Sequence, residues 1–330
     1  MKRQRGVPAT QPQRQSSPRK WKISGNDHIS KLPDDILYTI ILLLSMRDAV
    51  RTSVLSRRWK NMYAYISNLE FDWHNITPTP VNYNCGTVPK GYVRHFLGII
   101  DRFLARHLGT KVVSFKVSCC FGSMYAHRIT DWIIFAVRKG VESLDLAFTC
   151  DKPAERHDWR TVDYYPFPTQ LFLHGEESKL RHLSLRSVTL WSDFSDRFRT
   201  LSTLVLCDVN LAGPVEPRMF SSCLNLERLT LQWCFGLERL CLGDSLHRLK
   251  VLTVSLCDGL KGIELSATNL TIFHYKGDDT ELSFERVPNL EEVCVVMKGI
   301  NVITTFARLE KELPHVKTMT VTRDYLRRGY

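Results

Sequence analysis

Cysteine and histidine are the residue types of this chain best suited to metal binding or nucleophilic chemistry, and it holds ten and eleven of them. A structural zinc site needs closely spaced cysteine pairs joined by further cysteine or histidine ligands. No CxxC pair occurs, and no histidine stands at zinc-like spacing from a cysteine pair. In a reducing compartment we therefore expect buried thiols that behave as small apolar side chains. The cysteines are Cys85, Cys119, Cys120, Cys150, Cys207, Cys223, Cys234, Cys241, Cys257 and Cys294.

The sequence also lacks the short motifs that mark common active sites. We find no GxSxG, no HExxH, no P-loop and no GxGxxG dinucleotide loop. The acidic pair Asp34 and Asp35 fits the start of a helix, and Asp278 and Asp279 fit a turn. Histidines are scattered singly along the chain. The sequence thus predicts a protein that is not an enzyme and that needs no metal or cofactor.

The net charge of +11 is concentrated at the N-terminus. Residues 1–22 carry seven basic residues and no acid, so the rest of the chain carries only +4. We expect residues 1–23 to form a disordered basic tail, acting as a nuclear-import signal, a weak nucleic-acid contact or a plain solvated leader. Because the folded part has no basic footprint, nucleic acid is a poor candidate partner. No apolar run is long enough for a membrane span or a signal peptide, so we expect a soluble protein of the nucleus and/or cytoplasm, with no membrane partner.

A pattern of apolar-x-x-apolar-x-apolar recurs through most of the chain. The copies start mainly 20–29 residues apart, which is the period of leucine-rich repeats. Each copy ends in an alternating stretch that suits a strand with one buried face, and stacked copies can share one core. We therefore predict an α/β fold, an irregular leucine-rich-repeat solenoid with a parallel, horseshoe-like sheet. The copies start at Val112, Val141, Leu180, Leu201, Leu226, Leu249, Leu270, Leu290 and Val316.

The alternation also predicts which side chains face away from the core. One row, placed between the last two apolar positions of each copy, should cross the sheet from Lys116 to Thr320. Further residues flank this row, namely Gln232 and the three residues Arg186, Asp208 and Trp233. Because Trp and Arg dominate binding hot spots, we predict these three as target-binding residues on the concave face. The alternative for Trp233 is packing under a neighbouring loop.

Other segments interrupt the repeats. Residues 92–108 and 128–140 have apolar residues at helical spacing, and Gly140 is a suitable C-cap for the second helix. The segment 151–172 is rich in proline and aromatic residues, so we expect a long loop or excursion from the repeats. Cys120, Cys234 and Cys257 stand at the structural Asn/Cys position of the repeat, which predicts a packing role rather than catalysis.

The segment "LPDDILYTIILLLSMRDAVRTSVLSRRWKNMY", from Leu32 to Tyr63, predicts three short helices. Pro33 suits the first turn of a helix, Ser45 can cap a second, and Ser56 can cap a third that carries Trp59. The first helix is apolar around more than half of its circumference, which one intramolecular face cannot use. This surplus predicts a partner protein or a neighbouring domain.

The ordered strings "LPDDIL", "AVRTSVLSRRW" and "LEFD" resemble the F-box, and the chain that follows resembles plant F-box proteins with leucine-rich repeats. The resemblance implies a tail at 1–23, an F-box domain at 24–72 and a repeat domain at 73–330. It implies that the F-box binds a Skp-type adaptor and, through it, a cullin–RING ubiquitin ligase, while the repeats bind an unknown target protein. The residues that it places on or next to the adaptor surface are Leu32, Pro33, Ile36, Leu37, Ile40, Val54 and Trp59.

Family members often have proline where this chain has Ser45. An alternative function is therefore a leucine-rich-repeat scaffold that has no coupling to a ligase. Binding of a Skp-type adaptor distinguishes the two functions.

Overall fold

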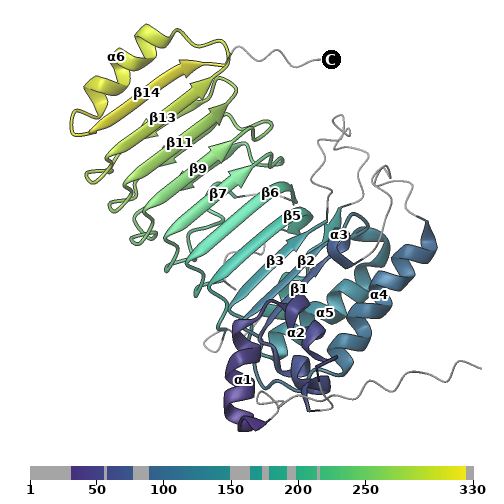
Figure 1. Cartoon of the computed structure of the whole chain (residues 1–330). Coiled ribbons are helices and arrows are strands. Elements are labelled where there is room, and N and C mark those ends of the chain that lie inside the picture. Colours follow the sequence, from purple (N-terminus) through teal and green to yellow (C-terminus); the bar gives the residue numbers. More distant parts are fainter. Residues whose placement is uncertain are drawn as a thin grey trace, which may run out of the picture.

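A parallel sheet of eleven strands runs along the chain from the helical end to the last helix, α6 (Figure 1). The computed structural model describes residues 31–55, 58–76, 89–148, 164–172, 178–191, 198–213 and 216–324. The predicted basic tail, Cys85, Cys150 and Ser56 lie outside these residues. In spatial order the strands are β1 (Asn68–Asp72), β2 (Ser114–Ser118), β3 (Ser143–Ala147), β5 (His182–Trp191), β6 (Thr203–Ala212), β7 (Arg228–Gln232), β9 (Val251–Ser255), β11 (Ile272–Gly277), β13 (Glu292–Met297) and β14 (Thr318–Arg323), with β4 (Tyr165–Pro166) paired to β5.

The register of the sheet confirms the predicted outward row. Neighbouring strands align its members one by one, and β1 adds Glu70 in front of them. The apolar residues on either side of this row point inward and are buried from β1 to β13. The aligned row is Lys116, Asp145, Ser184, Val205, Thr230, Thr253, His274, Cys294 and Thr320.

The sheet starts earlier than the sequence analysis predicted. The segment "LEFD" was assigned to the end of the helical domain, but it forms β1, whose Leu69 and Phe71 are buried in the common core. The next strand, β2, begins only at Ser114. The repeat period could not reveal β1 because this separation is about twice that of the later strands.

Two kinds of crossover connect many of the strands. At the two ends of the solenoid they contain helices, namely α4 (Lys90–Ala105), α5 (Ala126–Arg138) and α6 (Val302–Glu312). In between, three crossovers contain short strands that form a second parallel sheet, β8 (Arg239–Leu242), β10 (Gly262–Leu265) and β12 (Glu281–Phe284). The structure confirms both predicted helices and the C-cap, because Gly140 follows α5 with a φ of 69°. The remaining short elements are α3 (Trp73–Ile76), η4 (Ser123–Tyr125) and η6 (Thr169–Phe172).

The second part of the predicted loop or excursion at 151–172 packs against the repeats. Tyr165 pairs with Val188 of β5, and the ring of Phe172 lies 5.2 Å from that of Phe198. Phe167 is also buried. These aromatic side chains bury enough apolar surface to hold the segment against the repeats. The first part of the loop lies among residues 149–163, which are outside the described part of the chain.

Polar side chains connect successive turns of the solenoid at a position that the sequence analysis did not use. The side-chain amide of Asn225 donates to the carbonyl of Arg199 (2.8 Å), and that of Asn289 donates to Thr268 (2.8 Å). Asn269 makes the equivalent bond to His247. Each bond satisfies a carbonyl of the preceding turn, which would otherwise need water.

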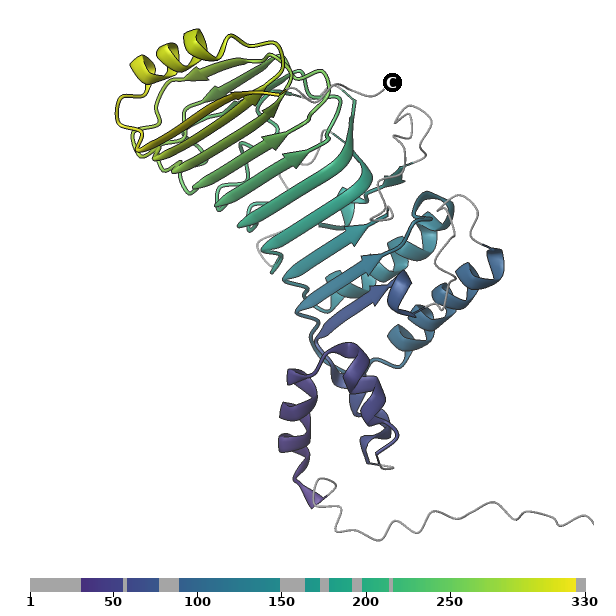
Figure 2. The same ribbon diagram turned by 45° about the horizontal axis from the view of Figure 1, so that its top comes forward.

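Three short helices precede β1 at one end of the molecule (Figure 2). They are α1 (Asp34–Leu43), α2 (Met46–Thr52) and the 3₁₀ helix η2 (Trp59–Tyr65), against which both α1 and α2 pack. Ser45 caps α2 as predicted, because its Oγ accepts from the backbone N–H of Asp48 (3.2 Å). Pro33 lies just before α1, in the N-cap position.

The helical unit and the solenoid share one apolar core. The backbone N–H of Leu108 donates to the carbonyl of Ala64 at the end of η2 (2.8 Å). His107 is buried beside it, and its Nε2 lies 2.8 Å from the carbonyl oxygen of Ile66. The N–H of Val113 donates to Ser67 (2.7 Å). The same buried cluster includes side chains from α1 to β14, so the two parts are packed together rather than linked by a tether.

Candidate protein-binding surfaces

Helix α1 has two apolar faces. Leu37 and Ile41, one turn apart, point into the core and are fully buried. Ile36 and Leu43 lie on another side of the helix, where their side chains are 43% and 82% exposed, and half-buried Ile40 lies between them. This spacing of four and three residues forms a continuous stripe along a helix. The surplus apolar surface predicted from the sequence is therefore present on the surface of the protein.

Further large apolar side chains are exposed on and after α2. Val50 is partly exposed, and Val54, four residues later, is 84% exposed, with exposed Leu55 next to it. Below them Ala49 is buried and closes the core. Of the thirteen large apolar side chains that are exposed in the described residues, six lie between Ile36 and Leu55. We call the six exposed residues together the apolar stripe, although Leu42 lies on a different side of α1 from Ile36 and Leu43: Ile36, Leu42, Leu43, Val50, Val54 and Leu55.

The predicted adaptor residues divide into two groups. Pro33, Ile36 and Val54 are exposed, and Leu32 and Ile40 are half-buried. Leu37 and Trp59 are buried inside the chain, so any part they take in binding is indirect, through the packing of the helices. The sequence analysis missed Leu42, Leu43, Val50 and Leu55, although an α1 that is apolar on more than one side was a signal for the first two.

The second surface is the open face of the large sheet, formed by the outward side chains of its strands. On the three adjacent strands β6, β7 and β9, two rows of aligned outward residues contain no charged side chain. The middle row is Val205, Thr230 and Thr253, and the last row is Cys207, Gln232 and Ser255. Charged or titratable residues flank these rows, such as Arg186 on β5 and Lys276 on β11. Burial raises the pKa of the Cys207 thiol, so this group stays neutral. We call these residues the neutral floor: Val205, Cys207, Thr230, Gln232, Thr253 and Ser255.

An unusual backbone conformation borders the neutral floor. In or just after four successive strands, β5, β6, β7 and β9, one residue at the edge of the open face has a φ between 52° and 55°. These residues are Ser187, Asp208, Trp233 and Leu256. Residues with a side chain rarely adopt this left-handed conformation, and for a bulky residue it costs roughly 1 kcal/mol or more. Trp233 is 48% exposed, and its backbone N–H donates to the carbonyl of Ser255 (2.9 Å). Trp233 thus stands in a strained position at the edge of the open face.

Asp208 has a structural role next to Trp233. Its Oδ1 accepts a hydrogen bond from the Tyr164 hydroxyl (2.8 Å), and its Oδ2 accepts one from the Ser187 hydroxyl (2.5 Å). The Tyr164 ring also packs on Phe235, with 5.6 Å between ring centres. Burial, together with the Asp208 carboxylate, raises the pKa of Tyr164 above its usual value. Asp208 therefore fixes the segment before β4 to the solenoid.

The three predicted target residues lie close together. Arg186 is level with Cys207 and Gln232 on the neighbouring strands, while Asp208 and Trp233 each follow one residue later. Trp233 is the most exposed of the three, since Arg186 and Asp208 are half-buried. The adjacency of strands β5, β6 and β7 brings these residues together, as the repeat pattern predicts.

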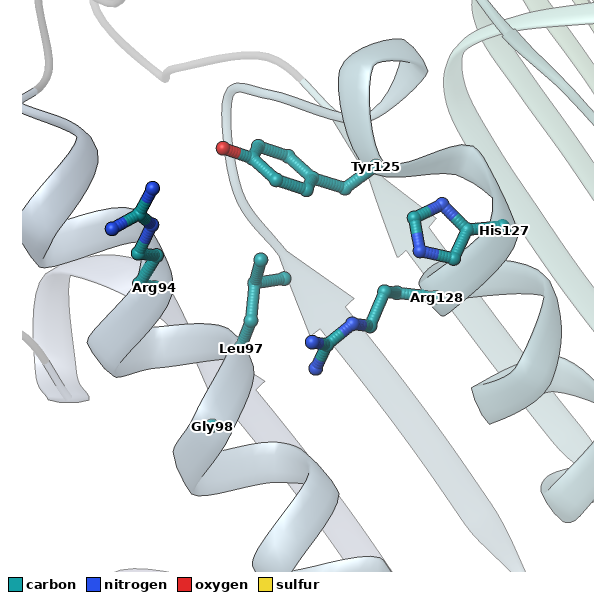
Figure 3. A pocket seen from close by; sticks show the side chains of 6 residues that line it. All are labelled: Arg94, Leu97, Gly98, Tyr125, His127 and Arg128. Atoms are coloured by element: carbon teal, nitrogen blue, oxygen red, sulfur yellow. The ribbon is translucent and has the colours of Figure 1, made fainter.

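A small pocket of about 240 Å³ lies between α4 and α5 (Figure 3). Arg128 and His127 approach it from α5, and Arg94, Leu97 and Gly98 approach it from α4. Arg128 forms an ion pair with Asp101, whose other carboxylate oxygen accepts from the Trp132 indole (2.9 Å). These bonds connect the two helices.

The described residues contain no group of three or more His, Cys, Asp or Glu side chains that could hold a metal ion. No helix among them combines the length and apolar character needed to cross a membrane. Burial raises the pKa of several thiols, to about 12 for Cys223, which opposes formation of a reactive thiolate.

Comparison with known protein families matches both parts of the chain. The F-box domain model matches residues 29–62, which include α1, α2 and the whole apolar stripe. The model described as "At1g61320/AtMIF1, LRR domain" matches residues 103–325, which is more than half of the chain. The chain belongs to the F-box/LRR-repeat family. The F-box match ends before β1, so β1 and most of α4 lie between the two matched regions.

Individual F-box/LRR-repeat relatives align over much of the chain. Putative F-box/LRR-repeat protein At5g02930 of Arabidopsis thaliana is 26% identical over 94% of this chain and 63% of its own length. F-box/LRR-repeat protein At3g58900 of the same plant is 28% identical over 86% of this chain and 82% of its own length. For F-box/LRR-repeat protein At3g59200 the covered share of the relative is 45%. The chain therefore spans about half to two thirds of several relatives that it matches.

Proposed function

We propose that this chain is the substrate-recognition subunit of an SCF-type ubiquitin ligase. Its F-box would bind a Skp-type adaptor and through it a cullin–RING ligase, and its repeats would bind the protein to be ubiquitinated. The observation that carries the proposal is the apolar stripe. The helices beneath it already have a closed core of Leu37, Ile41, Ala49 and Trp59, so the stripe is available to a partner.

The physical chemistry of the stripe favours a protein partner. Six large apolar side chains are exposed within a short segment formed by α1, α2 and the turn after α2, and such a concentration of exposed apolar surface marks protein–protein interfaces. Each large apolar side chain that is fully buried on binding stabilises a complex by roughly 1.5–3 kcal/mol before the costs of association. The cap formed by Ser45 keeps α2 intact without the usual proline, which supports a functional F-box.

The packed junction between helices and solenoid supports the second half of the proposal. A ligase receptor has to hold its target at a defined place relative to the adaptor, and His107 and Leu108 fix η2 to the repeats. We propose no catalytic step and no cofactor for the chain itself. We also propose the nucleus and/or cytoplasm as its location, which a fluorescent fusion with and without residues 1–22 would test.

The test is binding of a purified Skp-type adaptor, measured by calorimetry. Val54→Asp places a charge in the apolar stripe and should reduce adaptor affinity by at least about tenfold. Ile303→Asp is the matched control, because Ile303 is 80% exposed on α6, far from the F-box in the solenoid. The control should bind normally. Failure of the unaltered chain to bind the adaptor would favour the alternative, a repeat scaffold without ligase coupling.

A further inference from the structure

The repeat itself sets the left-handed conformation at Trp233, because Ser187, Asp208 and Leu256 adopt it at the same place in neighbouring repeats. The fold does not, however, require a tryptophan at this position. The Trp233 side chain is about half exposed, so it buries only part of its apolar surface, while its backbone has a φ of 52°. Asparagine or glycine would accept this conformation with far less strain. A large aromatic residue that costs stability at an exposed position is the kind of outlier from which a binding role follows.

The neighbouring strand extends the apolar surface around Trp233. Leu256 is half-buried, has the same conformation with a φ of 54°, and follows Ser255, whose carbonyl accepts from the Trp233 N–H. We call Trp233 and Leu256 the apolar ledge. Asp208, on the other side, is held by two hydrogen bonds within the chain, so the ledge rather than this carboxylate faces a partner.

The neutral floor beside the ledge determines the chemistry of the partner. Its side chains are hydroxyls, one amide, one protonated thiol and one valine. A charged side chain lying on the middle of this floor would lose water without a counter-ion in the floor itself, which is unfavourable. Uncharged backbone and side-chain groups can instead exchange hydrogen bonds with Thr230, Gln232 and Ser255.

We propose that the ledge and the floor bind an extended, uncharged segment of the target protein that presents one large apolar side chain to Trp233. This inference rests on the proposed function, because the occupant is the substrate of the ligase. It replaces the predicted trio of Arg186, Asp208 and Trp233 by Trp233, Leu256 and the floor. An acidic, phosphorylated or basic segment gains no opposite charge on the floor itself, because Arg186, Arg228 and Lys276 lie only at its edges.

The probe is a random-sequence peptide library displayed on phage and selected against the full chain. Selected peptides should carry an aromatic or large aliphatic residue flanked by uncharged residues. Trp233→Asn should weaken their binding by at least about tenfold, as at a hot spot. Trp191→Asn is the control, because Trp191 is 53% exposed at the end of β5 but lacks the positive φ, and it should leave affinity unchanged.

A second variant protects the test from effects on folding. Thr230→Glu adds a charge between Val205 and Thr253, away from the strained turn, and should also weaken peptide binding by at least about tenfold. Circular dichroism should show that Trp233→Asn melts no earlier than the unaltered chain. Selection of charged peptides, selection of none, or unchanged affinity in both variants would overturn the inference. Adaptor binding is measured separately by calorimetry. A chain that does not bind the adaptor contradicts the proposed function, whereas the peptide selection tests only the inference about the ledge and the floor.

Discussion

The F-box and the solenoid differ in how many of their apolar side chains are exposed. Between Ile36 and Leu55 the F-box leaves six large apolar residues exposed, whereas the inward residues of the sheet are buried from β1 to β13. A helix of ten residues can be apolar on two sides, but a strand in a covered sheet has one inward and one outward face. The F-box can therefore gain affinity from apolar area alone. The solenoid has to recognise its partner through a mainly polar face with few apolar residues.

The largest predicted effects that test this comparison concern α1. Leu37 and Ile36 are neighbours on the helix, but Leu37 is fully buried and Ile36 is 43% exposed. Leu37→Ala should lower the free energy of unfolding by about 2–5 kcal/mol, because it leaves a cavity. Ile36→Ala should change it by less than about 1 kcal/mol but weaken adaptor binding by roughly 2 kcal/mol. Thermal unfolding and calorimetry measure the two quantities. Equal stability losses in both variants would show that Ile36 belongs to the core.

The next largest effect concerns the polar side of the comparison. Asp208→Ala leaves the Tyr164 and Ser187 hydroxyls without their shared acceptor, so we expect a loss of about 1–3 kcal/mol in stability. Asp208→Asn retains an acceptor and should lose less. Denaturant unfolding measures both. If neither variant is destabilised, Asp208 does not hold the segment before β4, and it becomes a candidate for target binding again.

A smaller effect is expected at Ser45. Ser45→Ala removes the side-chain oxygen that accepts from the Asp48 N–H and should cost about 1 kcal/mol of stability. Ser53→Ala is a suitable control, since Ser53 follows the same helix at its C-terminal end. Circular dichroism during heating provides the measurement. A Ser45→Ala variant as stable as the control would mean that neighbouring packing, and not the cap, holds α2.

The regular parts of the fold could be predicted from the sequence. The two inward positions that Leu204 and Leu206 occupy are filled by large apolar or aromatic residues in the other repeats, at the same spacing. This period reveals both the strand and its inward face. β1 could not be found in this way because it has no neighbour at the repeat distance. The packing of Tyr164 and Phe172 against the repeats was missed because it depends on contacts between distant segments.

The candidate sites were predictable only in part. An α1 with too many apolar residues indicated a binding surface, but exposure decides that Ile36 lies outside and Leu37 inside. The residue type of Trp233 suggested a hot spot. Its left-handed backbone did not follow from the sequence, because tryptophan is among the residues least suited to that conformation. The strain is visible only when the paths of four neighbouring strands are known.

The smallest predicted effect is a pH dependence at the junction of the two regions. Burial, and to a lesser degree the charge of Lys139, lowers the pKa of His107 below 6.5, although its bond to the Ile66 carbonyl opposes the shift. Below pH 6.5 the unfolded chain therefore binds a proton that the folded chain resists, and stability falls as pH decreases toward the folded pKa. Above pH 6.5 the contribution of His107 is fully present. His107→Asn should be less stable than the unaltered chain at pH 8, and the gap should narrow as pH falls below 6.5. Thermal unfolding of both proteins over this pH range measures the difference in their stability. The titration of the other ten histidines cancels in this difference, because both proteins contain them. A gap that widens as pH falls would mean that charged His107 is stabilised at the junction, contrary to its buried position.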